Sequence, residues 1–104
     1  MISRKGWDKL YKAVKITLKP DIEKPSSCID IDEIQIKSGD VTTWYKKELV
    51  HDYVKAGVKI VVSNQNVVHE PELEAVVSSY GEKYVRSEKD DIKSDNLLML
   101  PIGK

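Results

Sequence analysis

Phenylalanine is absent from this sequence, so the hydrophobic core has to be built from other side chains. Apolar residues make up 40% of the chain and are mostly Val, Ile and Leu, with two Trp and five Tyr as the large pieces. β-branched and aromatic side chains pack well on a pleated surface, and this composition therefore favours strands. With 104 residues, the chain is expected to form one domain, residues 1–104, in which residues 1–9 are a flexible or helical arm.

Cysteine is nearly absent as well, since Cys28 is the single one in the chain. An intramolecular disulfide therefore cannot form, and a reducing compartment is expected. The N-terminus lacks the apolar run of a signal peptide, and no stretch is long enough to span a membrane. The sequence thus predicts a cytoplasmic protein without a membrane partner.

The sequence also lacks a net charge, because Lys and Arg together number 17 and so do Asp and Glu. Proteins whose main partner is a long phosphate backbone usually carry a basic excess, so the composition argues against that class. The charges are nevertheless uneven. Residues 1–24 carry seven basic and three acidic side chains, and residues 70–95 carry four basic and eight acidic ones. We expect these ends to be solvated or to attract each other, and the alternative is an anionic partner for the basic end.

The first segment fits two patterns. Apolar residues between Trp7 and Leu18 fall at helical spacing, whereas Val14, Ile16 and Leu18 alternate with polar residues as they would in a strand. We favour a strand over residues 10–19, followed by a loop that contains Pro20 and Pro25.

The next segment, residues 29–37, places its first two isoleucines at odd positions and its last two at even positions. A half-buried strand that changes face in this way needs one extra residue. We therefore predict a strand with a β-bulge near Asp32 and Glu33, followed by a turn at residues 38–40.

The segment from Thr43 to Ala56 is the one predicted helix. Thr42 or Thr43 is placed to cap its start, and Gly57 is placed to end it in the left-handed conformation. The apolar residues that form its expected buried stripe are Leu49, Val50, Tyr53 and Val54.

Residues 58–62 follow the helix without a linker and are predicted to form a central strand. Beyond a polar loop, residues 73–79 and 82–87 are predicted strands joined by a two-residue turn, Tyr80-Gly81, in which Gly81 supplies a positive φ. The predicted fold is therefore a compact α+β domain. One helix packs on an antiparallel or mixed sheet of about five strands, with the element order β-β-α-β-β-β.

The C-terminal run places the pair Asp95-Asn96 before an apolar stretch that begins at Leu97. Side chains of this type accept hydrogen bonds from backbone amides two or three residues further on, so the pair is suited to cap a turn. If the loop before it folds back, Asp95 can accept a bidentate bond from Arg86. We expect Arg86, Asp95 and Asn96 to form a structural latch, with the leucines after them covering the sheet.

A family resemblance becomes specific in this run, which reads Gly81-x-Lys-Tyr-Val-Arg-Ser87 and then Asp95-Asn-Leu-x-x-Leu-Pro101. It resembles the closing signature of a family of small bacterial and phage proteins, the domain of unknown function DUF3892. Further family marks are Trp44 at the head of a helix, Val50 within it, Gly57 at its end and Val61 in the following strand. Ser87 stands where the family more often has Thr. The resemblance covers about residues 10–101, supports the domain layout and implies a bacterial or phage gene, but it implies no catalytic residue.

Candidate catalytic groups are few. Cys28 lies before a strand and is expected to be a small, partly buried hydrophobic residue, and His51 is expected to be exposed on the helix. His69 lies near two glutamates, but no triad can be recognised from the spacing. The acidic residues of segment 30–33 are expected to protect a strand edge and not to bind calcium. One Cys and two distant His do not predict a zinc site, and no cofactor or metal is expected.

The best candidate for a ligand site is the cluster Trp44, Tyr45, Lys46 and Lys47, predicted at the helix start. Aromatic faces and cations of this kind hold nucleotide-like ligands, although Trp44 alternatively anchors the core. A second candidate contact surface is the loop that carries Asn64, Asn66 and His69.

From these features we expect a non-enzymatic protein that binds stoichiometrically, as a phage or mobile-element accessory protein that modulates a host protein such as a defence protein. One alternative is an oligomer that sequesters a nucleotide-like signal through the Trp44 cluster. Another is nucleic-acid binding through the basic N-terminal segment, whose affinity would fall steeply with salt. An unpaired strand edge would permit a homodimer.

Overall fold

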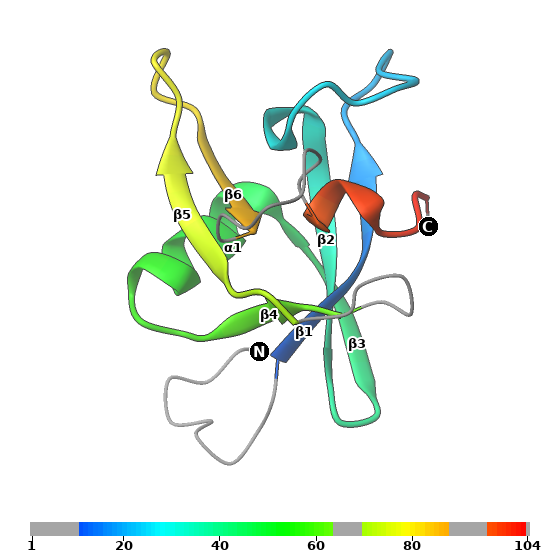
Figure 1. Cartoon of the computed structure of the whole chain (residues 1–104), viewed down its shortest axis with the longest axis vertical. Helices are drawn as coiled ribbons and strands as arrows, with labels where there is room; N and C mark the ends of the chain where they lie inside the picture. Colours follow the sequence, from blue (N-terminus) through cyan, green and yellow to red (C-terminus); the bar gives the residue numbers. More distant parts are fainter. Residues whose placement is uncertain (1–10, 64–69, 88–95, 104) are drawn as a thin grey trace.

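The computed structural model describes residues 11–63, 70–87 and 96–103, and its elements form two separate sheets (Figure 1). In chain order the elements are β1 (Tyr11–Leu18), η1 (Cys28–Asp30), β2 (Ile31–Ser38), β3 (Val41–Lys46), α1 (Lys47–Lys55), β4 (Ile60–Val62), β5 (Leu73–Val77), β6 (Lys83–Ser87) and η2 (Asn96–Met99). A mixed sheet has the strand order β3-β2-β1-β4, and β5 pairs antiparallel with β6. The predicted α+β class with one helix is confirmed. The single sheet of about five strands is wrong, because the described residues form six strands that divide between two sheets.

Strand β3 is the element that the sequence prediction missed. The prediction assigned residues from Thr43 onward to the helix, but the helix begins only at Lys47. The turn Gly39-Asp40 reverses the chain after β2, with Gly39 at a φ of 62°, and pairs Ser38 with Val41. The residues that follow are β-branched or aromatic and therefore favour a strand once β2 offers them an edge.

The predicted bulge in β2 is confirmed by the pairing of β1 with β2. Ile16 lies opposite Ile34 and Leu18 lies opposite Ile31, so β2 contains one extra residue between these pairs. The extra residue changes the parity of the strand, and both isoleucines are consequently buried. A second register shift, between Ala13 and Lys15, changes the parity of β1 in the same way.

The buried face of α1 differs from the predicted stripe. Val50 is fully buried as predicted, whereas Leu49 is 41% exposed. The other buried helical residues are Lys47 and His51, which face the β5–β6 hairpin. Two polar residues outside the predicted stripe are therefore buried, because each finds a polar partner on the hairpin.

Neither end of α1 is capped by a side-chain hydrogen bond. Its N-cap is Lys46, whose side chain makes no capping hydrogen bond, so the predicted threonine cap is wrong. At the other end Gly57 has a φ of 103°, and its amide donates to the Val54 carbonyl while the next amide, Val58, donates to the Tyr53 carbonyl. These two bonds form a Schellman motif, and they confirm the predicted helix end at Gly57.

Strand β4 was predicted to be central, but it is the last strand in the order of the four-stranded sheet. It runs parallel to the first half of β1, where Tyr11 lies opposite Ile60. The outer edge of β4 contacts the chain before β5: Val62 donates its amide to the Pro71 carbonyl, and Val61 forms a bridge with Glu72. All three residues of β4 are buried, which explains their continuous apolar sequence.

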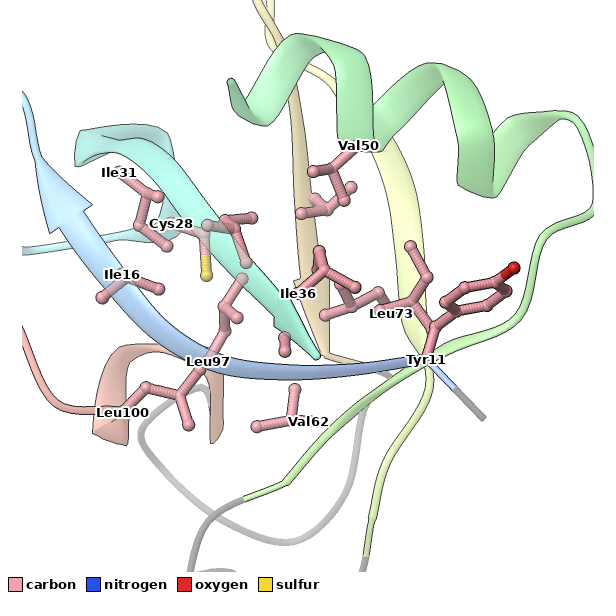
Figure 2. Close-up of a cluster of buried hydrophobic side chains, with 14 of the residues drawn as sticks. Tyr11, Ile16, Cys28, Ile31, Ile36, Val50, Val62, Leu73, Leu97 and Leu100 are labelled. Atoms are coloured by element: carbon pink, nitrogen blue, oxygen red, sulfur yellow. The ribbon is translucent and has the colours of Figure 1, made fainter. Parts of the chain in front are cut away.

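The hydrophobic core lies between the four-stranded sheet on one side and α1 with the β5–β6 hairpin on the other (Figure 2). Isoleucines of the sheet, Val50 of the helix and Leu73 of the hairpin contribute to it. Leu97 and Leu100, from the η2 segment, complete the core and are buried. The predicted covering of the sheet by the C-terminal leucines is therefore confirmed.

The end of the chain also completes the edge of β1. Strand β4 covers only the first part of that edge, up to Ala13. Further along, Ile16 donates its amide to the Pro101 carbonyl, and Gly103 donates its amide to the Ile16 carbonyl. The segment 101–103 thus takes the place that β4 leaves open beside β1.

We predict that Leu97→Ala lowers the free energy of unfolding by about 2–5 kcal/mol, because it leaves a cavity in the core. Chemical denaturation of the purified variant measures this change. Ile102→Ala is the matched control, since Ile102 is 51% exposed and contributes to the sheet through its backbone. The control is expected to change stability by less than about 0.5 kcal/mol. Equal losses for both variants would contradict the proposed burial of the C-terminal leucine.

Candidate functional site

The tip of the β5–β6 hairpin presents one large aromatic side chain to solvent. Strand pairing ends at Val77 and Lys83, and Ser78 then donates its amide to the Glu82 carbonyl, so three residues form the loop and not the predicted two. Gly81 has a φ of 84°, as the sequence predicted. Tyr80, the middle residue of the loop, is 95% exposed.

The tip is held by the Ser78 side chain. Its Oγ accepts hydrogen bonds from the Tyr80 amide at 3.2 Å and from the Glu82 amide at 3.1 Å. The Gly81 amide donates to the Ser78 carbonyl at 2.9 Å. A loop with its amides paired in this way has few alternative conformations, so Tyr80 is presented in a defined position.

An ion cluster fixes the hairpin to the rest of the domain directly below the tip. Lys47, the first residue of α1, is only 2% exposed, and its Nζ lies 2.7 Å from Glu82 and 3.2 Å from Glu48. Glu82 also pairs with Lys19, at 2.6 Å, just after β1. One carboxylate of the hairpin therefore joins the start of the helix to the end of β1.

The charges of this cluster change the pKa values of its members. Hydrogen bonds from Lys19 and Lys47 lower the pKa of Glu82 below its usual value. Burial by itself lowers the pKa of Lys47, but the hydrogen bonds to Glu82 and Glu48 outweigh it, and the pKa is raised. Both groups are consequently held in their charged forms.

His51 forms a second connection between α1 and the hairpin. It is 2% exposed, which corrects the expectation of an exposed side chain, and its Nδ1 lies 2.9 Å from the Tyr84 carbonyl oxygen. A carbonyl oxygen only accepts, so Nδ1 carries the proton and donates. Within the described part of the chain, the buried Nε2 has no hydrogen-bond partner.

The other candidates for chemistry have structural positions. Cys28 is buried in the core, as expected. Asp30 accepts hydrogen bonds from the Ser26 amide and hydroxyl, which lower its pKa, and Asp32 pairs with Lys46. Among residues 11–63, 70–87 and 96–103, no group of three or more His, Cys, Asp or Glu side chains is arranged to hold a metal ion.

The four side chains of the predicted cluster at residues 44–47 do not all lie on one face of the structure. Trp44 and Tyr45 lie on β3, where successive side chains point to opposite faces of the sheet. Tyr45 is on the core face and packs edge-to-face against Tyr53, with the ring centroids 6.1 Å apart. Trp44 is on the other face, opposite Gln35, while Lys46 pairs with Asp32 and Lys47 is buried.

Several other predicted positions lie outside the described residues: Asn64, Asn66, His69, Asp95 and the basic N-terminal segment as far as Leu10. Arg86, the predicted partner of Asp95, lies 3.5 Å from Glu74 across the hairpin, and both side chains are about half exposed. Asn96 is the first residue of η2. The latch between Arg86 and Asp95 therefore stays a prediction.

Sequence reasoning missed the roles of Tyr80, Lys47, Glu82 and His51. For Tyr80 a signal was present, because a tyrosine in the middle of a hairpin turn cannot reach the core. The ion cluster had no local signal, since Lys19, Lys47 and Glu82 are separated by about 30 residues each and are adjacent only in the fold.

A comparison with family models matches residues 14–101 to one described as "Protein of unknown function (DUF3892)". The match spans most of the chain and includes the ion cluster, the hairpin tip and η2. Neither the curated proteins nor the solved structures contain a match to the sequence. No helix in the described ranges has the length and apolar character needed to cross a membrane.

We predict that Glu82→Gln lowers the free energy of unfolding at pH 7 by about 1–2 kcal/mol, because it leaves Lys47 buried with Glu48 alone. Because the pKa of Glu82 is lower in the folded protein than its usual value, the ionised carboxylate stabilises the fold fully above the usual Glu pKa. This stabilisation is lost as the pH falls through the pKa of Glu82 in the folded protein. The difference between wild type and variant should therefore shrink below about pH 4. Denaturation curves measured between pH 3 and 7 check both points.

Glu74→Gln provides the matched control for this variant. It removes a hairpin carboxylate whose ion pair with Arg86 is long and solvated, so a change of at most about 0.5 kcal/mol is expected. If both variants lose the same stability, the ion cluster does not have the role described here.

Proposed function

Since the chain belongs to the DUF3892 family, whose name assigns no activity, we propose a function from its surface: stoichiometric, non-enzymatic binding of another protein through the tip of the β5–β6 hairpin. The observation that carries the proposal is the exposed Tyr80 on a hydrogen-bonded loop. Tyrosine is enriched among the residues that dominate binding energy, because its large rigid ring loses little conformational entropy on binding.

The surroundings of Tyr80 support a protein partner. Val77, at the end of β5, is 53% exposed, so the hairpin presents an aliphatic side chain as well as the aromatic one. The base of the hairpin is fixed to α1 and β1 by the ion cluster, which reduces the entropy lost when a partner orders the tip. The matching partner surface is an apolar pocket with a hydrogen-bond acceptor for the phenol group.

A non-enzymatic function is supported by the positions of two reactive side chains. Catalytic nucleophiles and bases have to reach a bound substrate. The side chains of Cys28 and His51 are buried, and Nδ1 of His51 is occupied by the Tyr84 carbonyl. These residues contribute to packing in the present fold.

The proposed biological setting follows from the family resemblance to small bacterial and phage proteins. In this proposal the chain is a phage or mobile-element accessory protein, and its partner is a cytoplasmic host protein, such as a defence protein, whose activity it modulates. Sequestration of a nucleotide-like signal by residues 44–47 is less favoured, because Tyr45 packs against the core and Lys47 is buried in an ion pair.

We predict that Tyr80→Ala reduces the amount of partner captured from a bacterial lysate at least about tenfold, because it removes the anchor of the interface. Ser79→Ala, in the same loop, is the matched control and should capture the partner as wild type does. Mass spectrometry quantifies the captured protein, and the free energy of unfolding of both variants should stay within about 0.5 kcal/mol of wild type.

Two results would contradict this proposal. One is equal capture by wild type and Tyr80→Ala. The other is catalytic turnover by the purified protein that is abolished when His69 or Cys28 is replaced.

A further inference from the structure

The outer edge of β5, on the side away from β6, carries backbone groups that no other described strand pairs (Figure 1). Ser78 donates its amide to the Glu82 carbonyl, so the backbone groups of Ser78 point toward β6. Backbone groups alternate in direction along a strand, and those of Val77 and Ala75 therefore point away from β6. Within the described part of the chain, the amides and carbonyls of these two residues form no hydrogen bond. The edge thus offers donors and acceptors to a further strand.

The open part of this edge is short and regular. Strand β4 closes its start, because Val61 forms an antiparallel bridge with Glu72. The open part therefore begins after Leu73 and ends at the turn after Val77. Proline, lysine and bulges commonly protect strand edges from pairing, but β5 contains neither residue type and its register with β6 is continuous. Its one charged side chain, Glu74, forms an ion pair across the hairpin.

The sequence of the open edge is complementary to itself when two copies run antiparallel. With a two-fold axis at Val76, Ala75 of one copy lies opposite Val77 of the other, and the two Val76 side chains lie opposite each other. Each Ala75 and Val77 pair exchanges its amide and carbonyl groups, so that all the outward backbone groups of both residues are bonded. In the same register Glu74 lies opposite Ser78, and no like charges face each other.

We infer that β5 pairs with β5 of a second copy of this chain, so that the two hairpins form one four-stranded antiparallel sheet in a symmetric dimer. A two-stranded sheet is marginal in water, and joining two of them bonds the open edge of each. The chain has no net charge, so two copies do not repel each other at long range. Val77 is 53% exposed, and Ala75 of the second copy packs beside it.

A second copy fits this edge better than an extended segment of an unrelated protein. Any extended chain supplies backbone groups, but the second copy also supplies small and β-branched side chains opposite Ala75 and Val77, and a neutral Ser78 opposite Glu74. The few hydrogen bonds of this contact are fewer than the roughly ten of a typical interface, so we expect a weak dimer whose population depends on protein concentration.

Sedimentation velocity of the purified protein between about 10 μM and about 1 mM tests the inference, because a small interface associates in this range. The apparent mass should rise with concentration from that of a monomer toward that of a dimer. Val77→Pro removes an outward amide and places a ring in the edge without removing a hydrogen bond to β6. It should weaken the association at least about tenfold, since one bond is lost from each copy.

Thr42→Pro is the matched control, because it makes the same chemical change at another strand edge. Val41 pairs with Ser38 across the turn Gly39-Asp40, so the amide of Thr42, the next residue, points to the outer edge of β3. This variant should associate as wild type does. Circular dichroism checks that both proline variants are folded.

Amide NMR spectra of the wild-type protein locate the contact without any substitution. The signals of Ala75 and Val77 should shift as the protein concentration rises, whereas that of Thr42 should not. The inference is overturned if wild type stays monomeric over the whole range, if Thr42→Pro loses as much association as Val77→Pro, or if the concentration-dependent shifts lie outside β5. None of these results affects the Tyr80 proposal, because capture of a partner protein by the hairpin tip does not require a second copy.

Discussion

The fold depends on one requirement, which is that the backbone of β1 be hydrogen-bonded along both edges. A buried amide or carbonyl without a partner is costly, and β1 lies in the interior of the four-stranded sheet. Strand β2 covers one edge, but β4 covers only the first part of the other. The remaining part is covered by residues 101–103, which places the buried Leu97 of η2 and the buried Leu100 after it against the core. The position of the chain end therefore follows from the shortness of β4.

The second sheet is attached to the first by polar groups as well as by packing. Glu82 holds Lys47 and Lys19, and His51 donates to the Tyr84 carbonyl. Lys83 also pairs with Asp52, so the hairpin is bonded to the helix at three points. A two-stranded hairpin is marginal by itself in water. Its attachment explains how the loop that carries Tyr80 can extend from the domain and still have a defined conformation, which is a property that a binding surface needs.

The alternation of side chains along β3 separates two surfaces that the sequence joins. Trp44 and Tyr45 are neighbours in the chain, yet Trp44 points away from the core and Tyr45 packs on Tyr53 at the edge of the core. The type of secondary structure therefore decides which of these residues share a face, and the strand places Trp44 and Tyr45 on opposite faces of the sheet.

The sequence by itself determined the features that depend on local chemistry. The bulge in β2 follows from a parity change among four isoleucines, the helix end follows from Gly57, and the hairpin follows from Gly81. The burial of Leu97 and Leu100 follows from an apolar run after a polar pair. In each case the feature can be predicted from residues close together in the sequence, because it depends on the periodicity of apolar residues or on a glycine with a positive φ.

The tertiary structure alone decided where the charged and polar side chains go. Residues 43–45 have β-branched or aromatic side chains, but only pairing with β2 makes residues 43–46 part of a strand and not the first turn of the helix. The burial of Lys47 and His51 requires a carboxylate and a carbonyl that the chain supplies about 35 residues later. These contacts join residues that are distant in the chain, so they cannot be predicted from hydrophobic spacing or local propensity.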